Sequence, residues 1–214
     1  MKRSLLPGLL LACLSLSTQA HEIWIERDGA GPVRVYFGEP AQEVLDHGED
    51  ELKRVVAPDI FGPHGKATAV TREGDHLVAP LHGDGDAWLF DDKVFEPWQG
   101  EGSKYESVSY YARAGRQSTA SKLDFELVPA SAGGDVLTVL YHGKPLPDAE
   151  VTVIDPRKWT RQLKSDTQGR VTLPRLAAGR HIVVATHKEA VQRQIAGKLV
   201  TTVHHISTLT FLAE

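Results

Sequence analysis

Short runs of apolar or alternating residues, separated by clusters of Gly, Pro and Asp, dominate the chain and predict strands. In the first half of the chain, the predicted strands are 23–25, 33–37, 77–81, 87–90 and 107–112. Residues 39–56 are richer in Glu, Leu and Lys, which favours a short helix there. The many charged residues of 91–105 indicate a long exposed connection.

A small, polar stretch at 113–122 changes the pattern, and we place a domain boundary there. The strands predicted beyond it are 123–128, 136–141, 149–154, 162–165, 170–173, 181–186 and 200–211. Short strands at this spacing are typical of an immunoglobulin-like or transthyretin-like sandwich. We therefore predict an all-β fold of two β-sandwich-like units, 21–118 and 122–214.

Residues 1–20 have the pattern of a secretory signal peptide. Lys2 and Arg3 precede an apolar run, which ends in small residues before Ala20. This run is too short to span a bilayer as a permanent helix. Cleavage after Ala20 gives a periplasmic protein that begins at His21. A lipid anchor at Cys13 is the rival prediction, but the leader before that residue is very short.

The composition narrows the classes of partner. Removing residues 1–20 lowers Lys+Arg from 24 to 22 against 28 Asp+Glu, so the net charge falls from −4 to −6. Nucleic acids and anionic lipids require concentrated Lys and Arg, so neither is an expected partner. Cys13 is the sole cysteine, so the mature chain has no disulfide and no thiolate ligand. No second apolar run approaches ~20 residues, and no membrane insertion is expected after cleavage.

His21 carries the most specific chemical prediction. As a first residue it has an α-amino group, with an ordinary pKa of roughly 7.7–8, beside an imidazole with an ordinary pKa of about 6.5. Both lose protons readily to a metal ion, and together they form a chelate ring. A further histidine completes a nitrogen set that suits Cu(II) or Ni(II). The common amino-terminal motif needs histidine at the third mature position, which here is Ile23.

Three downstream histidines, His187, His204 and His205, follow or lie in predicted strands. Neighbouring strand side chains face opposite ways, so His204 and His205 can reach one ion only across a bulge. His205 shares its face with apolar residues, whereas His204 shares a more solvent-like face with threonines. The predicted ligands are His21, His187 and one of His204 or His205, with Glu22 or Glu189 as an optional carboxylate. The alternative is that the strand histidines are ordinary edge or core residues, and that cleavage exposes His21 without giving it a role in metal binding.

Enzyme signatures are missing from the sequence. It has no G-x-S-x-G elbow, no cysteine pair and no glycine-rich phosphate loop. The segment HEIWI begins like the H-E-x-x-H motif of metalloproteases but has Ile25 in place of the second histidine. We therefore predict that the protein is not an enzyme.

Several segments carry a family resemblance. In order, HGKPLPDAEVTV (142–153), SDTQGRVTLP (165–174) and GRHIVVATHKE (179–189) resemble the transthyretin-like module of exported and surface proteins. With HEIWI (21–25) and HHISTLTF (204–211), the chain resembles bacterial domain-of-unknown-function family 4198. Its exported members are often labelled nickel- or cobalt-uptake components. The resemblance implies a periplasmic protein that binds or hands over Ni, Co or Cu.

The expected function is therefore a periplasmic metal-binding or metal-uptake accessory protein. Its expected partners are a metal ion and a metal transporter or outer-membrane receptor. The alternative is a structural or docking β-sandwich without metal. A copper-dependent oxidase with an amino-terminal histidine ranks last, because aromatic residues are only 7% of the chain and none clusters near His21.

Overall fold

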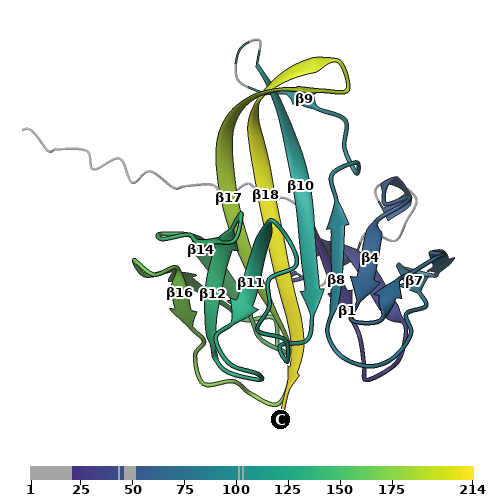
Figure 1. Ribbon diagram of the computed structural model, residues 1–214, viewed down its shortest axis with the longest axis vertical. Helices are drawn as coiled ribbons and strands as arrows, with labels where there is room; N and C mark the ends of the chain where they lie inside the picture. The colour runs from purple at the N-terminus through teal and green to yellow at the C-terminus, as the bar shows by residue number, and fades with distance from the viewer. Residues whose placement is uncertain (1–20, 43, 46–51, 101, 103) are drawn as a thin grey trace, which may run out of the picture.

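The computed structural model describes residues 21–42, 44–45, 52–100, 102 and 104–214. Within these residues, the 3-10 helix η1 (Leu52–Arg54) is the single helical element, and all other regular elements are strands. The strands form sheets of nine, five and four strands (Figure 1). The predicted all-β fold is confirmed. In the described part of the chain, no helix has the length and apolar character needed to cross a membrane.

The nine-stranded sheet is the centre of the molecule. Its order is β15 (Thr160–Lys164), β14 (Glu150–Ile154), β17 (Gly179–Ile195), β18 (Lys198–Ala213), β10 (Tyr105–Ala114), β8 (Ala87–Asp91), β4 (Asp59–Gly62) and β5 (Gly65–Lys66), with β9 (Trp98–Gln99) beside β10. The long strands β17 and β18 form a hairpin. Its two turn residues, Ala196 and Gly197, both have positive φ, as the tightest hairpin turns require. β10 runs parallel to β18, so strands from both predicted units share this sheet.

The five-stranded sheet covers one face of the central sheet. It contains β1 (Glu22–Glu26), β2 (Val33–Glu39), β3 (Val44–Leu45), β6 (Thr71–Glu73) and β7 (His76–Ala79). Apolar residues of β1 and β2, such as Ile23 and Phe37, pack with Tyr110, Val184 and Ile206 of the central sheet in one core. All five are at most 4% exposed, so this interface buries a continuous apolar layer.

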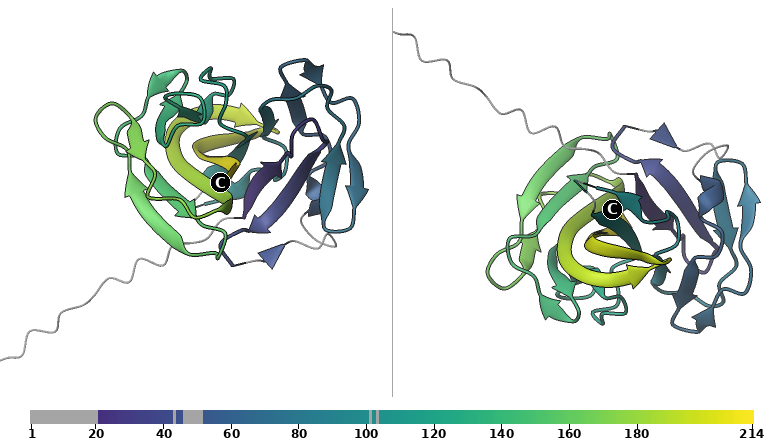
Figure 2. Two further views of the ribbon diagram at one scale, coloured as in Figure 1. Left: turned by 90° about the horizontal axis from the view of Figure 1, so that it is seen from below. Right: turned by 90° about the horizontal axis from the view of Figure 1, so that it is seen from above.

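The four-stranded sheet covers part of the opposite face. It contains β11 (Phe125–Pro129), β12 (Val136–Tyr141), β13 (Lys144–Pro145) and β16 (Arg170–Thr172). Phe125 and Val139 pack with Tyr111, Val183 and Leu209 in a second core. Figure 2 shows the purple and blue strands of the five-stranded sheet on one side of the long hairpin and green strands on the other. The central sheet is therefore packed on both faces.

A buried ionic network lies close to the predicted domain boundary. Arg113 Nη2 donates to Asp86 Oδ2 (2.6 Å), and Arg113 Nη1 donates to Glu126 Oε1 (2.9 Å). The indole Nε1 of Trp88 also donates to Glu126 Oε1, at 2.8 Å. Arg113 is 1% exposed and Glu126 is fully buried. Because Glu126 lies in β11 and the other three belong to the predicted unit 21–118, the network ties the two parts of the chain together.

The predicted strands and the observed ones agree closely, with each predicted strand overlapping an observed one. Of the short helix expected within 39–56, the described residues contain the 3-10 helix η1, and Val44–Leu45 form the strand β3 instead; residues 43 and 46–51 lie outside the described residues. The connection 91–105 contains the short strand β9 and the buried Val94, so it is not wholly exposed. Residues 1–20 also lie outside the described residues, so the signal peptide, the cleavage after Ala20 and the Cys13 alternative stay predictions.

Candidate metal centre

The two neighbouring histidines of β18 point to opposite faces of the central sheet. His205 lies directly opposite His187 of β17 in the antiparallel register, so these two share one face. His204 is one residue away and lies on the other face, with Ile206 and Thr208. The register shift between β17 and β18 falls at Ala190 and Arg193, away from both histidines.

The strand that follows the predicted cleavage site is fixed on the His204 face. The Thr208 hydroxyl donates to the carbonyl oxygen of Ile23 at 2.8 Å, and this contact is buried. The His21 ring packs on Phe37 at 5.4 Å between centroids, and Phe37 contacts Tyr110 of β10 edge-on at 5.9 Å. These contacts place the amino end of β1 over β10 and β18.

Glu22 and His204 line the same groove, which has a volume of about 1170 Å³. Thr186, His187 and Lys188 of β17 and Ile206 of β18 also line this groove, so the predicted ligand His187 reaches it as well. Burial, and to a lesser extent the charge of Glu39, raises the pKa of the Glu22 carboxyl from 4.5 to about 8. Glu22 is therefore largely protonated in neutral solution, and a cation bound beside it would displace that proton.

His204 has a carboxylate partner that the sequence pattern did not reveal. Its Nε2 lies 2.6 Å from Glu106 Oε2, and both side chains are 24% exposed. The ring of Trp98 lies 5.7 Å from the His204 ring. Glu106 belongs to β10, whose parallel pairing with β18 joins segments almost a hundred residues apart. Only that long-range pairing identifies Glu106 as part of the site.

On the opposite face, His205 is surrounded by oxygen groups. Its Nδ1 lies 3.1 Å from the Tyr111 hydroxyl, and its Nε2 lies 3.4 Å from both the Tyr141 hydroxyl and Glu189 Oε2. The His187 ring lies 6.1 Å from the His205 ring between centroids. Burial is the main reason why the pKa values of the His187 and His205 imidazoles are lowered.

The structure thus divides the residues predicted as one ligand set. Glu22 and His204 line one groove, and His21 directly precedes Glu22, whereas His187, His205 and Glu189 lie on the other face of β17 and β18, with His187 also reaching the groove. Within the described ranges, no three His, Cys, Asp or Glu side chains converge as a ready metal site. If cleavage makes His21 the first residue, its α-amino group would add one more nitrogen ligand, beyond these side chains, on the β1 face.

His204 is the more exposed of the two histidines, as expected, with 24% of its side chain exposed against 5% for His205. Further along the same face the expectation does not hold, because Thr208 and Thr210 are each 1% exposed, and Thr208 contacts β1 of the five-stranded sheet. His205 is 4% exposed, in agreement with its predicted core-like position.

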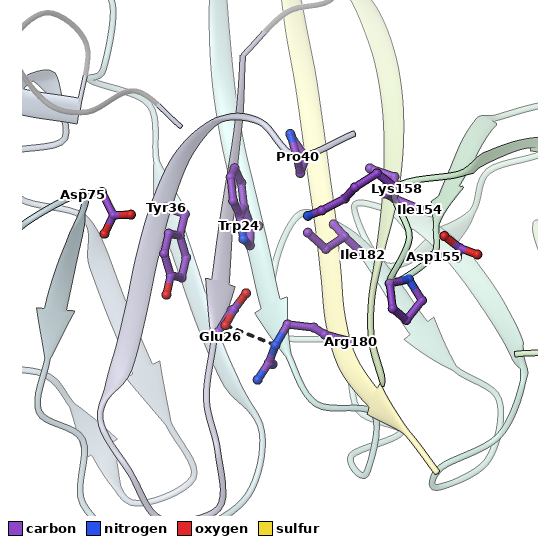
Figure 3. Close-up of a pocket in the computed structure, with 11 residues that line it drawn as sticks. Trp24, Glu26, Tyr36, Pro40, Asp75, Ile154, Asp155, Lys158, Arg180 and Ile182 are labelled. Atoms are coloured by element: carbon purple, nitrogen blue, oxygen red, sulfur yellow. Dashed lines mark ion pairs between the residues drawn. The ribbon is translucent and has the colours of Figure 1, made fainter. Parts of the chain in front are cut away.

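A second pocket, of about 450 Å³, lies further along β1 (Figure 3). The rings of Trp24 and Tyr36 stack in it at 5.3 Å between centroids. Arg180 Nε pairs with Glu26 Oε2 at 3.1 Å. Ile154 lines both this pocket and the groove that contains Glu22, so the two hollows are neighbours along one side of β1.

The unusual pKa of Glu22 leads to a testable pH dependence. Its folded pKa of about 8 exceeds the ordinary 4.5, so between these pH values the folded chain holds a proton that the unfolded chain releases. The free energy of unfolding therefore falls as pH rises through this window. We expect Glu22→Gln to reduce that fall, measured from urea midpoints on the two sides of the window. The exposed Glu73→Gln variant is the control, and its free energy of unfolding should fall with pH as it does in the unmodified chain. An equally steep fall in Glu22→Gln would contradict the raised pKa of Glu22.

Comparison with curated proteins and with solved structures gives no match. The transthyretin-like character of the second half therefore stays a prediction. A family match covers residues 18–189, from the predicted cleavage site to Glu189 in β17. The chain belongs to the family described as a domain of unknown function, DUF4198.

Proposed function

We propose that the protein is an exported, periplasmic protein that binds a divalent transition metal ion and serves metal uptake as an accessory component. Its site lies on the β1 face. The ligands are the α-amino group and imidazole of a mature His21 and the imidazole of His204. The carboxylates of Glu22 and Glu106 border the ion.

One observation carries this proposal above the others: the Thr208–Ile23 hydrogen bond holds the start of β1 against β18, where Glu22 and His204 line one groove. An amine and two imidazoles from separate strands form a nitrogen-rich set, with carboxylates beside it. Such a set favours Cu(II) most strongly, followed by Ni(II) and Co(II).

The His204–Glu106 pair places a carboxylate directly beside the imidazole of the proposed ligand. In the absence of an ion, Glu106 is within hydrogen-bond distance of His204 Nε2. A bound ion would take the place of a proton between them, either with Glu106 as a further ligand or with Glu106 as an outer-shell acceptor. Outer-shell carboxylates of this kind fix the orientation of a ligating histidine.

The groove suits exchange of the ion with a partner. Both His204 and Glu106 keep about a quarter of their side-chain surface exposed. An ion held there would be reachable by a metal transporter or an outer-membrane receptor. A closed structural site would bury its ligands more completely.

The test is Cu(II) and Ni(II) binding by chains that begin at His21. We expect His204→Ala to weaken affinity at least about tenfold, since even outer-shell changes lower metal affinity by that amount. The exposed His82→Ala is the matched control and should bind like the unmodified chain. Affinity unchanged by His204→Ala would overturn the proposal and favour the docking alternative.

The docking alternative has one observation of its own. β15 is an edge strand of the central sheet, and Trp159, immediately before it, is 71% exposed. Exposed tryptophans beside open sheet edges are features of surfaces that bind other proteins.

A further inference from the structure

The central sheet ends at β15 in an open edge. Among the described residues, β15 pairs with β14 alone, so the backbone along its other side meets no further strand. The side chains of β15 are exposed apart from Leu163, which is half-buried. A sheet edge of this kind can accept an extended segment of another chain as an additional strand.

Basic residues are concentrated at this edge. The segment 157–164 has four basic residues and no acidic one, in a chain whose net charge is −4. The four are Arg157, Lys158, Arg161 and Lys164. Arg157 pairs with Asp155 at 3.0 Å, whereas within the described part of the chain the side chains of Arg161 and Lys164 form no ion pair. Two cations of β15 itself are therefore available to acidic groups of another molecule.

An exposed tryptophan stands at the start of the edge in a fixed position. Trp159 is 71% exposed. Its backbone N–H donates to Asp155 Oδ1, and its carbonyl oxygen accepts the N–H of Asp155, both at 3.0 Å. The Arg157 guanidinium lies over the Trp159 ring, 4.8 Å from its centroid. Because this side chain is already ordered, burying it against a partner costs little further entropy.

A second copy of this chain fits the edge poorly. Two copies of β15 paired with each other would bring basic strands side by side, and like charges facing each other destabilise a sheet. Basic side chains on an edge strand do hinder such self-pairing. That protective role does not require an ordered, exposed tryptophan beside them. The charge and the tryptophan together favour a partner that carries acidic and apolar residues.

We propose that β15 is a docking edge for an acidic, extended segment of a partner protein, which adds to the central sheet as a further strand. In the antiparallel arrangement, the more stable of the two, each partner residue lies opposite one residue of the edge. Trp159 and Arg161 point to one face and Lys164 to the other. The matching segment has acidic residues opposite Lys164 and Arg161 and an apolar residue opposite Trp159. These are its first, fourth and sixth positions.

The docking edge borders the groove that contains His204. Thr160, Gln162 and Lys164 of β15 line this groove together with His204. A partner segment held at β15 would therefore lie along the same groove as the proposed metal site. This consequence rests on the proposed function, whereas the docking edge itself does not.

The probe is a synthetic, fluorescein-labelled peptide with Glu at its first and fourth positions, Leu at its sixth and Thr elsewhere. Its binding to the chain that begins at His21 is followed by fluorescence anisotropy. We expect saturable binding that weakens as salt is added, since exposed charges contribute to it. Arg161→Glu combined with Lys164→Glu should weaken binding at least about tenfold, because like charges then face each other. Trp159→Ala, which removes the apolar anchor, should weaken it by at least about the same factor.

Three controls separate strand docking from other effects. Arg72→Glu changes an exposed arginine of β6, an edge strand of the five-stranded sheet, and should leave peptide binding unchanged. A peptide with Lys in place of both Glu residues should prefer the chain with Arg161→Glu and Lys164→Glu, which shows that this variant is folded. Methylation of the peptide's amide nitrogens should abolish binding, because the methylated segment cannot donate to the edge.

Peptide affinity that charge reversal or amide methylation leaves unchanged would overturn the docking edge, as would the absence of peptide binding at low salt. Association with phosphatidylglycerol vesicles through Trp159, without binding of the peptide, would also overturn it and assign the edge to a lipid surface. The His204→Ala chain should bind the peptide like the unmodified chain. None of these results therefore bears on Cu(II) binding by His21.

Discussion

Replacing Arg113 with methionine is expected to lower the free energy of unfolding by about 3–5 kcal/mol, the range for breaking a buried ion pair from one side. Arg113 bridges Asp86 and Glu126, whose side chains are 2% and 0% exposed. It also donates to the carbonyl oxygens of Gly115 and Ser118. Methionine keeps much of the packing volume but leaves two buried carboxylates without their cation.

Urea unfolding measures this effect. The exposed Arg72→Met, in β6, is the control for removal of a strand arginine, and its midpoint should stay near that of the unmodified chain. Because the network connects β10 with β11 across the predicted boundary, the Arg113 variant should still unfold in a single transition. A midpoint close to that of the Arg72 control would mean that the network contributes little to stability.

The strands of this fold could be predicted because their signal is local. Alternation of apolar and polar residues, with Gly- and Pro-rich turns between, is visible within each short segment. The strand 136–141, for example, has the predicted bounds. Within 39–56, where a short helix was expected, the local preferences were weaker: the 3-10 helix η1 forms at Leu52–Arg54, but pairing with β2 makes Val44–Leu45 a strand.

Pairing between distant strands could not be predicted from the pattern, and it decides the composition of the site. Glu106 and His204 meet because β10 runs parallel to β18. The sequence alternation correctly separated His204 from His205 but could not show which sheet covers which face. Thr208 consequently appeared solvent-like, although the five-stranded sheet buries it and its hydroxyl binds Ile23.

The contact of Tyr141 with His205 was missed for a related reason. Nothing local to β12 sets Tyr141 apart from a packing residue. Only the layer arrangement brings its hydroxyl to the Nε2 of His205. His187 and Glu189, spaced two apart on one strand, were identifiable as same-face neighbours from sequence alone.

The largest expected effect on binding comes from one residue added before His21. The added residue turns the α-amino group of His21 into an amide, which breaks the chelate ring while leaving the imidazole and all of β1 unchanged. Because outer-shell changes already weaken metal affinity about 10–100-fold, loss of this ligand should weaken Cu(II) affinity by more than about a hundredfold.

The most direct measurement is therefore a calorimetric titration with Cu(II) of two purified chains, one beginning at His21 and one with a single alanine before it, their lengths verified by intact mass. The account predicts tight binding by the first and a loss of more than about a hundredfold in the second, with equal thermal stability of the two metal-free chains. Equal affinity of the two chains for Cu(II) would contradict it.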